Sequence, residues 1–240
     1  MIRWLTMVRV AWRLFFIQSS WNFNNMQGIG MFHACYPVLQ KLQMAEKGMR
    51  HFARYFTTNP YMVGVVVGVA LHYEVQRGEH LSSEYKDTLA SFFGAIGDAF
   101  FWATFRPAIF ALGVTMYFVE PLRPLCLWLP LGIYVVVTLG ARFYGLYLGY
   151  IHGMSVVQRV HPRLLHLLID SLKNSHFIFA GVIFSITMYR IFTLYDTYYL
   201  GIAILFVLLN LIMFHFMRVN FFILIISALM FIIEFSRQLL

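Results

Sequence analysis

The sequence predicts an all-α integral membrane protein: a multi-span helical bundle with broken or re-entrant helices and an N-terminal amphipathic helix at the membrane interface. Hydrophobic residues fill 60% of the 240 positions and charged residues only 12%, with a mean hydropathy of +0.71. Soluble domains carry about a quarter charged residues. One apolar run, Gly94–Val114, also contains an acid, Asp98, and a base, Arg106, which a plain lipid-facing span excludes.

Residues 1–17 predict an amphipathic helix that lies in the plane of the interface and binds anionic lipid. The polar residues Thr6, Arg9 and Arg13 share one arc of the helical wheel. The bulky apolar residues share another: Trp4, Met7, Val8, Ala11, Leu14 and Phe15. A surface helix that faces a protein partner is the alternative. Because arginines interrupt this segment, it does not resemble a cleavable signal peptide, and we expect insertion without processing.

Residues 18–160 are expected to form the membrane core, which begins with the polar stretch QSSWNFNNMQGIG. Its amides and hydroxyls either cap the following helix or contact another subunit, and the candidate contact residues are Gln18, Ser20, Trp21 and Asn22. A basic connection follows, which we place on the cytoplasmic side. It consists of Lys41, Lys47, Arg50, His51 and Arg54.

The segment Phe56–Glu74 opens with a turn at Asn59–Pro60 and continues as an apolar run. The run is short for a crossing, which needs about 20 residues, so a half-helix or hairpin arm is expected. Gly64 and Gly68 form a small-xxx-small pair that would let another helix approach closely. The polar stretch Arg77–Asp87 is expected to be exposed.

In Gly94–Val114, Gly94, Gly97 and Pro107 favour a broken or re-entrant helix. On a straight helix, Asp98 and Arg106 would lie about 12 Å apart along the axis, too far to pair directly. Either a bend brings the two together, or each has a partner elsewhere. The candidate partners are Glu74 for Arg106 and an amide of residues 18–25 for Asp98. A purely structural buried pair is the alternative to a solute pathway.

Beyond a two-proline turn at Glu120–Pro124, a further span is expected over 125–140, continuing into a glycine- and tyrosine-rich segment that is typical of helix packing. Residues 159–173 form a second basic connection. Residues 161–240 are expected to supply the C-terminal transmembrane helices, with plain spans at 177–194, 198–217 and 219–235.

The motifs of self-sufficient enzymes are missing from the sequence. The nine histidines include no HExxH pair, and Cys35 and Cys126 lie far apart as expected buried hydrophobes, so neither a metal nor another cofactor is predicted. GAIGD lacks the lysine of a phosphate-binding loop. The excess of 18 Lys+Arg over 10 Asp+Glu is scattered, which argues against nucleic-acid binding. Polar groups at broken helices are instead typical of solute-binding sites at membrane depth.

Three stretches, QSSWNFNNMQGIG, FTTNPYMVGVVVG and GAIGDAFFWATFRPAI, occur in an order and spacing that resemble the IID membrane component of mannose/fructose/sorbose-family sugar phosphotransferase permeases. The resemblance covers about the first two thirds of the chain. It implies a multi-pass subunit in the bacterial cytoplasmic membrane, without a phosphoryl group of its own. With a IIC partner, in multimers of IIC–IID pairs, such a subunit moves a hexose inward while soluble IIA and IIB proteins supply the phosphoryl group.

The chain departs from that family pattern at Ser91–Phe93, where a proline is usual, and at His72–Glu74, where adjacent acids are usual. Both departures bear on the sugar pathway or its gating. The candidate pathway or gating residues are Asn59, Glu74, Asp98, Trp102, Thr104 and Arg106. A membrane scaffold that docks phosphotransferase proteins without moving sugar is the alternative function.

Overall fold

The computed structural model describes residues 3–78, 80–159, 167–175, 179, 181–183 and 186. This part of the chain is mostly helical and contains no β-strand beyond two isolated bridges, Asn22 with Met26 and Met26 with Phe56. The spans expected at 198–217 and 219–235 lie outside the described residues, as does most of 177–194. The predicted helical fold class is therefore confirmed for the described part.

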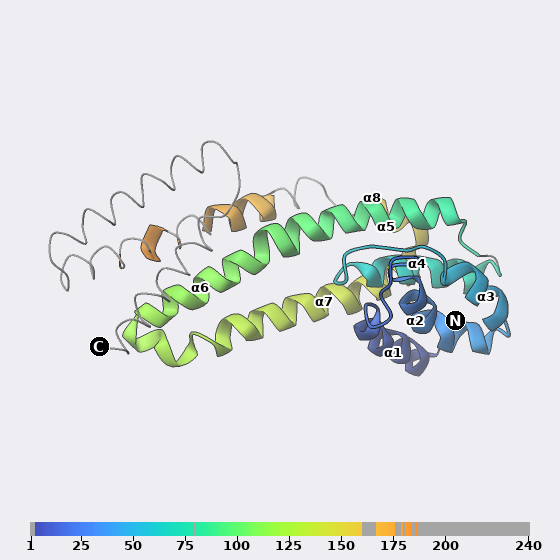
Figure 1. Cartoon of the computed structure of the whole chain (residues 1–240), viewed down its shortest axis with the longest axis horizontal. Helices are drawn as coiled ribbons and strands as arrows, with labels where there is room; N and C mark the ends of the chain where they lie inside the picture. Colours follow the sequence, from blue (N-terminus) through green and yellow to red (C-terminus); the bar gives the residue numbers. More distant parts are fainter. Residues whose placement is uncertain are drawn as a thin grey trace.

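The helices follow one another along the chain with short connections, and α1 to α4 gather at one end of the molecule (Figure 1). The order is α1 Trp4–Arg13, the 3₁₀ turn Leu14–Phe16, α2 Gly28–Lys41, α3 Ala45–Phe52, α4 Val63–Gln76, α5 Ser83–Gly97, the π-helix η2 Asp98–Phe105, α6 Arg106–Phe118, the 3₁₀ turn Glu120–Leu125, α7 Trp128–His152, the 3₁₀ turn Gly153–Ser155 and α8 Val156–Arg159.

Two helical segments of the described chain are long and apolar enough to cross a membrane: Ser83–Phe118, with 36 residues, and Trp128–Arg159, with 32 residues. They run beside each other as a long hairpin that extends away from the helices at the other end (Figure 1). By contrast, α4 has only 14 residues, or about 21 Å at 1.5 Å per residue. It is too short to cross the hydrocarbon core, as the length of its apolar run predicted.

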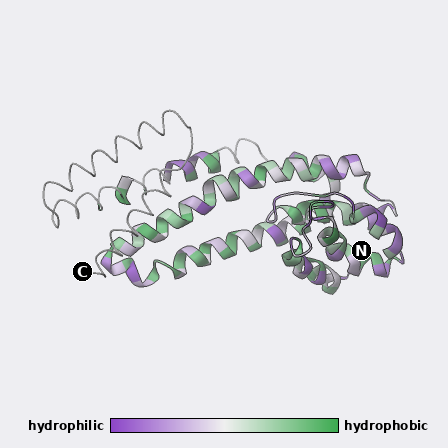
Figure 2. Ribbon diagram, viewed as in Figure 1, coloured by the Kyte–Doolittle hydropathy of each residue, from purple (hydrophilic) through white to green (hydrophobic). Residues whose placement is uncertain are grey.

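Both long helices expose bulky apolar side chains. Phe110 is 55% exposed, Trp128 69% and Val136 70%. Hydrophobic residues also occur along the whole length of both helices (Figure 2). Such exposure is unfavourable in water and favourable in lipid or against another apolar surface. These helices therefore have the surface of membrane-embedded segments.

The structure differs from the break expected in Gly94–Val114, because the chain there stays helical from Ser83 to Phe118. Gly97 has φ −63° and ψ −41°, ordinary helical values. The irregularity takes the form of the eight-residue π-helix η2. Pro107 is the second residue after it, and the wider π-turns accommodate a residue that lacks an N–H and whose ring crowds the preceding turn.

Helices α4 and α7 pack backbone to backbone through paired glycines. A Cβ atom on Gly64 would lie 2.0 Å from the carbonyl oxygen of Arg142, and one on Gly149 would lie 2.3 Å from that of Val65. Gly68 likewise leaves no room for a side chain, because its Cβ would lie 2.3 Å from the carbonyl oxygen of Leu146 in α7. Only glycine permits this approach, which confirms the close helix contact predicted from the glycine spacing.

The buried core lies where α2, α4 and the start of α5 meet, with α3 and α1 packed around them. Fully buried residues include Met31, Leu39, Phe52, Val66, Val67, Leu71, Leu89 and Phe93. Burial of each such side chain contributes about 1.5–3 kcal/mol. Cys35 is buried, as expected, whereas Cys126 is only half-buried.

Helix α1 turns part of its polar arc toward the rest of the chain. Thr6, which shares that arc with Arg9 and Arg13, is buried, and its hydroxyl accepts a hydrogen bond from Lys41 Nζ at 2.5 Å. Arg13 is half-buried, and its Nη1 donates to the carbonyl oxygen of His33 at 3.0 Å. The outward face carries Trp4 and Trp12, which are 74% and 65% exposed. The helix thus buries Thr6, leaves Arg9 exposed and exposes both indoles.

Candidate functional site

The turn that precedes α4, Thr57–Tyr61, is the polar centre of the structure and is called here the Asn59 turn. The Asn59 side-chain oxygen accepts a hydrogen bond from the backbone N–H of Tyr61 at 3.0 Å, a local bond typical of Asn in turns. The Asn59 carbonyl oxygen accepts from the N–H groups of Met62 and Val63, each at 3.0 Å. The Asn-Pro sequence therefore both forms the turn and starts α4.

Gln27 and Thr58 fix one side of this turn. The Gln27 amide donates to the Thr58 carbonyl oxygen at 3.0 Å and accepts from the Thr58 N–H at 3.2 Å. The Thr58 hydroxyl donates to the carbonyl oxygen of Ala90 in α5 at 2.8 Å. Both polar residues are buried, so these bonds satisfy groups that would otherwise be costly to bury.

The Asn59 side chain also reaches the first residue of the π-helix. Its Nδ2 donates to Asp98 Oδ1 at 2.8 Å. Gly97 makes room for this contact, since a Cβ there would lie 2.5 Å from Asn59 Cβ. Asn59 is only 2% exposed while Asp98 is exposed. The pair therefore joins the interior of the molecule to its surface at the junction of α5 and η2.

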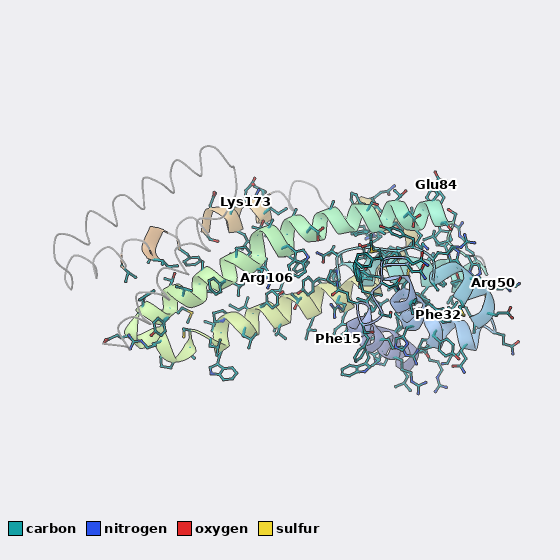
Figure 3. All side chains as sticks on the ribbon, viewed as in Figure 1. Phe15, Phe32, Arg50, Glu84, Arg106 and Lys173 are labelled. Atoms are coloured by element: carbon teal, nitrogen blue, oxygen red, sulfur yellow. The ribbon has the colours of Figure 1, made fainter. Side chains whose placement is uncertain are left out.

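Thr104, Trp102 and Arg106 lie further along the same helical segment. The buried Thr104 hydroxyl donates to the carbonyl oxygen of Ala99 at 2.8 Å, which ties one π-turn together. The Arg106 guanidinium lies over the Trp102 ring, 5.1 Å from its centroid, in a cation–π contact. Both of these residues are exposed. Arg106 lies on the long helix beyond the compact end that carries Phe15 (Figure 3).

Asp98 and Arg106 do not pair with each other or with the partners considered from the sequence. The partner of Asp98 is Asn59 rather than an amide of residues 18–25. Glu74 bonds His80 rather than Arg106, with 2.5 Å between Glu74 Oε1 and His80 Nδ1. The structure thus brings together Asn59, Asp98, Trp102, Thr104 and Arg106 on adjoining segments, and it places Glu74 at the opposite end of α4.

Glu74 belongs to a second polar cluster with His80, His51 and Lys86. The His51 and His80 rings stack with centroids 4.8 Å apart, and Lys86 Nζ donates to the His51 carbonyl oxygen at 3.5 Å. Burial raises the pKa of Glu74, against the hydrogen bond from His80. Burial, and then the nearby Lys86, His80 and Arg54, lower the pKa of His51 to about 4, although a backbone hydrogen bond with Leu81 opposes them.

The 18–22 segment forms a surface loop after the first 3₁₀ turn. The Asn22 side-chain oxygen accepts from the N–H groups of Asn24 and Asn25 at 3.0 and 2.8 Å, so it organises the loop itself. Trp21 is 47% exposed, and its ring packs edge-on against Phe23, with centroids 5.1 Å apart. Gln18 is exposed, and Ser20 is half-buried.

Arg142 was not expected from the sequence, although it is central to the site. Its Nε and Nη2 donate to the Pro60 carbonyl oxygen at 3.1 and 3.0 Å. Beside it, the Tyr61 and Tyr134 hydroxyls are hydrogen-bonded at 2.6 Å. The signal that could have found Arg142 is the one that drew attention to Asp98 and Arg106, namely an ionisable residue inside an apolar run.

The fold and this polar joint define a helical membrane protein in which a buried turn connects two helices of membrane-crossing length. A family model described as "PTS system mannose/fructose/sorbose family IID component" matches residues 2–230. The chain belongs to this family of membrane subunits of sugar phosphotransferase systems. The match extends well beyond the first two thirds of the chain to which the sequence motifs pointed.

Curated relatives agree with this assignment. Over 153 residues the chain is 29% identical to the mannose-specific EIID component of Escherichia coli K12, covering 59% of this chain and 53% of the relative. It is 27% identical over 154 residues to the fructose permease IID component of Bacillus subtilis 168, covering 60% and 55%. The sorbose-specific EIID component of Lacticaseibacillus casei is 28% identical over 165 residues, covering 62% and 56%. The chain spans about half the length of the curated relatives it matches.

Two solved structures share the fold. One, described as a membrane protein, has a TM-score of 0.64 at 24% identity and covers 76% of this chain and 70% of its own. The other is the mannose transporter ManYZ in complex with microcin E492, with a TM-score of 0.57 at 25% identity and coverage of 77% and 70%. The likeness agrees with the reading of the two long helices as membrane segments.

Proposed function

We propose that this chain acts with a IIC partner to move a hexose across the bacterial cytoplasmic membrane, coupled to phosphorylation of the sugar by IIB. The observation that carries the proposal is the Asn59–Asp98 hydrogen bond, at 2.8 Å, between a buried turn and the start of a π-helix. Irregular π-turns inside long helices are frequent at functional sites. The similarity to the mannose transporter ManYZ supports this role.

The groups around this bond are chemically suited to a sugar. A carboxylate and an amide can accept and donate hydrogen bonds to hydroxyls, and aromatic rings can pack against the apolar face of a pyranose. The Tyr61 and Trp102 ring centroids lie 5.7 Å apart, with Tyr61 in the Asn59 turn and Trp102 in η2, the π-helix that Asp98 begins. We assign the pathway to Asn59, Asp98 and Trp102, with Arg106 as a gate and Thr104 as a brace of the π-turn.

The helix α1 is proposed to lie in the membrane interface. Trp4, Leu5 and Trp12 are 74%, 62% and 65% exposed, and indoles concentrate at the boundary between lipid and water. Arg3 and Arg9 flank this aromatic face in the sequence and would attract anionic headgroups. We further propose that residues 18–160 form the core of a multi-pass subunit and that residues 161–240 add its C-terminal spans.

The IIC contact is proposed to include the surface loop with Gln18, Ser20, Trp21 and Asn22. The exposed pair of Trp21 and Phe23, which are 47% and 87% exposed, offers the kind of aromatic anchor that dominates protein interfaces. In the assembly we infer, IIC–IID pairs form multimers. Soluble IIA and IIB proteins, rather than this chain, carry the phosphoryl group.

The test is hexose uptake in cells that lack their own mannose-family permease. The full-length chain is expressed with its IIC, IIB and IIA proteins, and radiolabelled mannose, glucose, fructose and sorbose are supplied in turn. Accumulation of at least one phosphorylated sugar, lost when this chain or IIC is omitted, is the expected result. A complex that assembles and binds IIB but accumulates none of these sugars would overturn transport in favour of a scaffold.

A further inference from the structure

Arg142 is a buried cation inside a helix of membrane-crossing length. It lies in α7, within the candidate span Trp128–Arg159, and is only 8% exposed. Among the described residues, no carboxylate lies within ion-pair distance of it. A buried charge in such a segment is costly unless other groups replace its hydration. Its partners therefore indicate why it is there.

Among the described residues, the Arg142 side chain contacts the Asn59 turn and the 3₁₀ turn Leu14–Phe16. Two guanidinium nitrogens, Nε and Nη2, donate to the same acceptor, the Pro60 carbonyl oxygen. The guanidinium carbon lies 4.8 Å from the Phe15 ring centroid and 5.7 Å from that of Tyr61. Two aromatic faces and a forked bond to one oxygen favour a planar guanidinium over a lysine ammonium.

The backbone of Arg142 is held as closely as its side chain. Gly64 packs directly on its carbonyl oxygen, so α4 crosses α7 at this residue. One residue before the clamped Pro60 carbonyl, Asn59 extends its amide to Asp98. On the other flank, Tyr61 bonds Tyr134, which is eight residues from Arg142 on α7, or about 12 Å along the helix axis.

We propose that Arg142 is a positioning residue for the pathway site: by holding the Pro60 carbonyl oxygen, it sets the Asn59 amide against Asp98. This inference rests on the proposed function for the role of that site. Helix α7 holds the turn from one side, and the α5–η2 segment holds it from the other through Asp98 and Ala90. The turn thereby couples the two helices of membrane-crossing length.

A disulfide cross-link can report whether the turn is in place. Thr58→Cys and Gly94→Cys would form the reporter pair, because a Cβ at Gly94 would lie 3.7 Å from Thr58 Cα and 3.6 Å from Thr58 Oγ1, so the two side chains are adjacent and within reach of a disulfide. The experiment uses the full chain in membranes with its IIC partner, and Cys35→Ala and Cys126→Ala remove the native thiols. Cross-linking is started with a mild oxidant and followed by gel mobility.

Arg142→Gln should slow formation of the Thr58–Gly94 cross-link about tenfold, the effect of losing a charge-assisted hydrogen bond. Arg142→Lys should restore part of the rate, since it keeps the charge but not the fork. Arg159→Gln, a change of an exposed arginine at the end of the same segment, is the matched control and should leave the rate unchanged. An unchanged rate in Arg142→Gln would overturn the inference.

A second cysteine pair separates positioning from general misfolding. Val65→Cys and Gly145→Cys join α4 to α7, where a Cβ at Gly145 lies 2.8 Å from the Val65 side chain. Arg142→Gln should leave this cross-link intact. Loss of both cross-links would mean that Arg142 merely stabilises the fold, which also overturns the inference.

Uptake supplies the functional readout. In Arg142→Gln the KM for the transported sugar should rise about tenfold at an unchanged amount of IIC–IID complex, with partial rescue in Arg142→Lys. Equal uptake kinetics in Arg142→Gln and the unmodified chain would overturn the positioning role. If the unmodified complex moves no sugar, the proposed function fails, while the cross-linking rates still decide whether Arg142 positions the turn.

Discussion

The Asn59 amide and the Asp98 carboxylate meet at 2.8 Å, the amide on the turn before α4 and the carboxylate on the first residue of the π-helix η2. Asn59 is almost fully buried, so its orientation is fixed by its neighbours, whereas Asp98 is exposed. Hydrogen bonds to a charged partner are stronger than neutral ones. The pair is therefore both a structural joint and an exposed negative charge, and substitutions can separate these roles.

Asp98→Asn should abolish most hexose uptake while the IIC–IID complex still purifies, because the amide oxygen of Asn can still accept from Asn59 but the charge is gone.

Asn59→Asp should lower the stability of the complex by about 1.5–3 kcal/mol, since a charge-assisted bond is replaced by two carboxylates that repel each other. Uptake and the unfolding temperature of the complex measure the two effects.

Asp87→Asn is the control for the loss of an acid, because Asp87 lies exposed on α5 away from the π-helix. It should leave uptake and stability unchanged. Wild-type uptake of several hexoses by Asp98→Asn would show that the charge of Asp98 is not needed for sugar transport.

The helical fold and the glycine contacts could be predicted from the sequence because they depend on local pattern. Apolar length predicts helices of membrane-crossing length, and the Gly64–Gly68 spacing predicts a close helix neighbour without naming it. Asp98 and Asn59 were both expected at the site, but not as partners, because 39 residues separate them and only the fold determines which distant side chains meet.

The expected break at Gly94 and Gly97 illustrates the limit of local reasoning. Glycine is compatible with a bend, but here Gly97 is needed for space, since the Asn59 side chain occupies the volume that a Cβ would fill. The helix accommodates Pro107 through the π-helix that precedes it and continues without a break. Similarly, the helical wheel of α1 predicts a polar and an apolar face but not which of them packs against the rest of the chain. Thr6 is buried because Lys41 donates a hydrogen bond to its hydroxyl.

Gly149→Ala should strongly destabilise the chain, because the new methyl group would lie 2.3 Å from the Val65 carbonyl oxygen and force α4 and α7 apart. We expect a loss of several kcal/mol, in the range of severe overpacking. Gly140→Ala on the same helix is the control, since nothing lies within 4 Å of its Cβ position. Unfolding temperatures of the purified complex compare the two, and equal values would contradict the close packing.

His51 should make the compact end of the molecule sensitive to acid. Its pKa is lowered from 6.5 to about 4 in the folded chain, so between these values the unfolded chain binds more protons. Stability then falls as the pH drops from about 6.5 to 4. Unfolding temperatures measured across this range should show the slope, and His51→Phe should flatten it.

The contribution of Glu74 has the opposite sign. Its raised pKa means that the folded chain binds this proton more tightly than the unfolded chain does, so this contribution is present at low pH and is lost as the pH rises through the raised value. Since the two effects oppose each other, Glu74→Gln in the wild-type background should steepen the acid slope that His51 produces. An unchanged slope in both His51→Phe and Glu74→Gln would exclude this cluster as its source.

Glu74 should not be required for sugar transport, although the sequence made it a candidate pathway residue. It lies at the far end of α4 from Asn59, with its side chain fully buried and bonded to His80. Its second oxygen, Oε2, is buried and has no hydrogen-bond partner among the described residues. Glu74→Gln removes the titratable carboxyl while keeping the shape of the side chain. Hexose uptake should stay within about twofold of wild type in Glu74→Gln.

Glu74→Ala should instead lower the unfolding temperature, because it leaves a cavity and removes the partner of His80. The pair of variants therefore distinguishes a residue that holds His80 against α4 from one that contacts the solute. If Glu74→Gln lost uptake at normal stability and assembly, Glu74 would be a pathway residue after all, since only a role of its carboxyl group in transport would account for the defect.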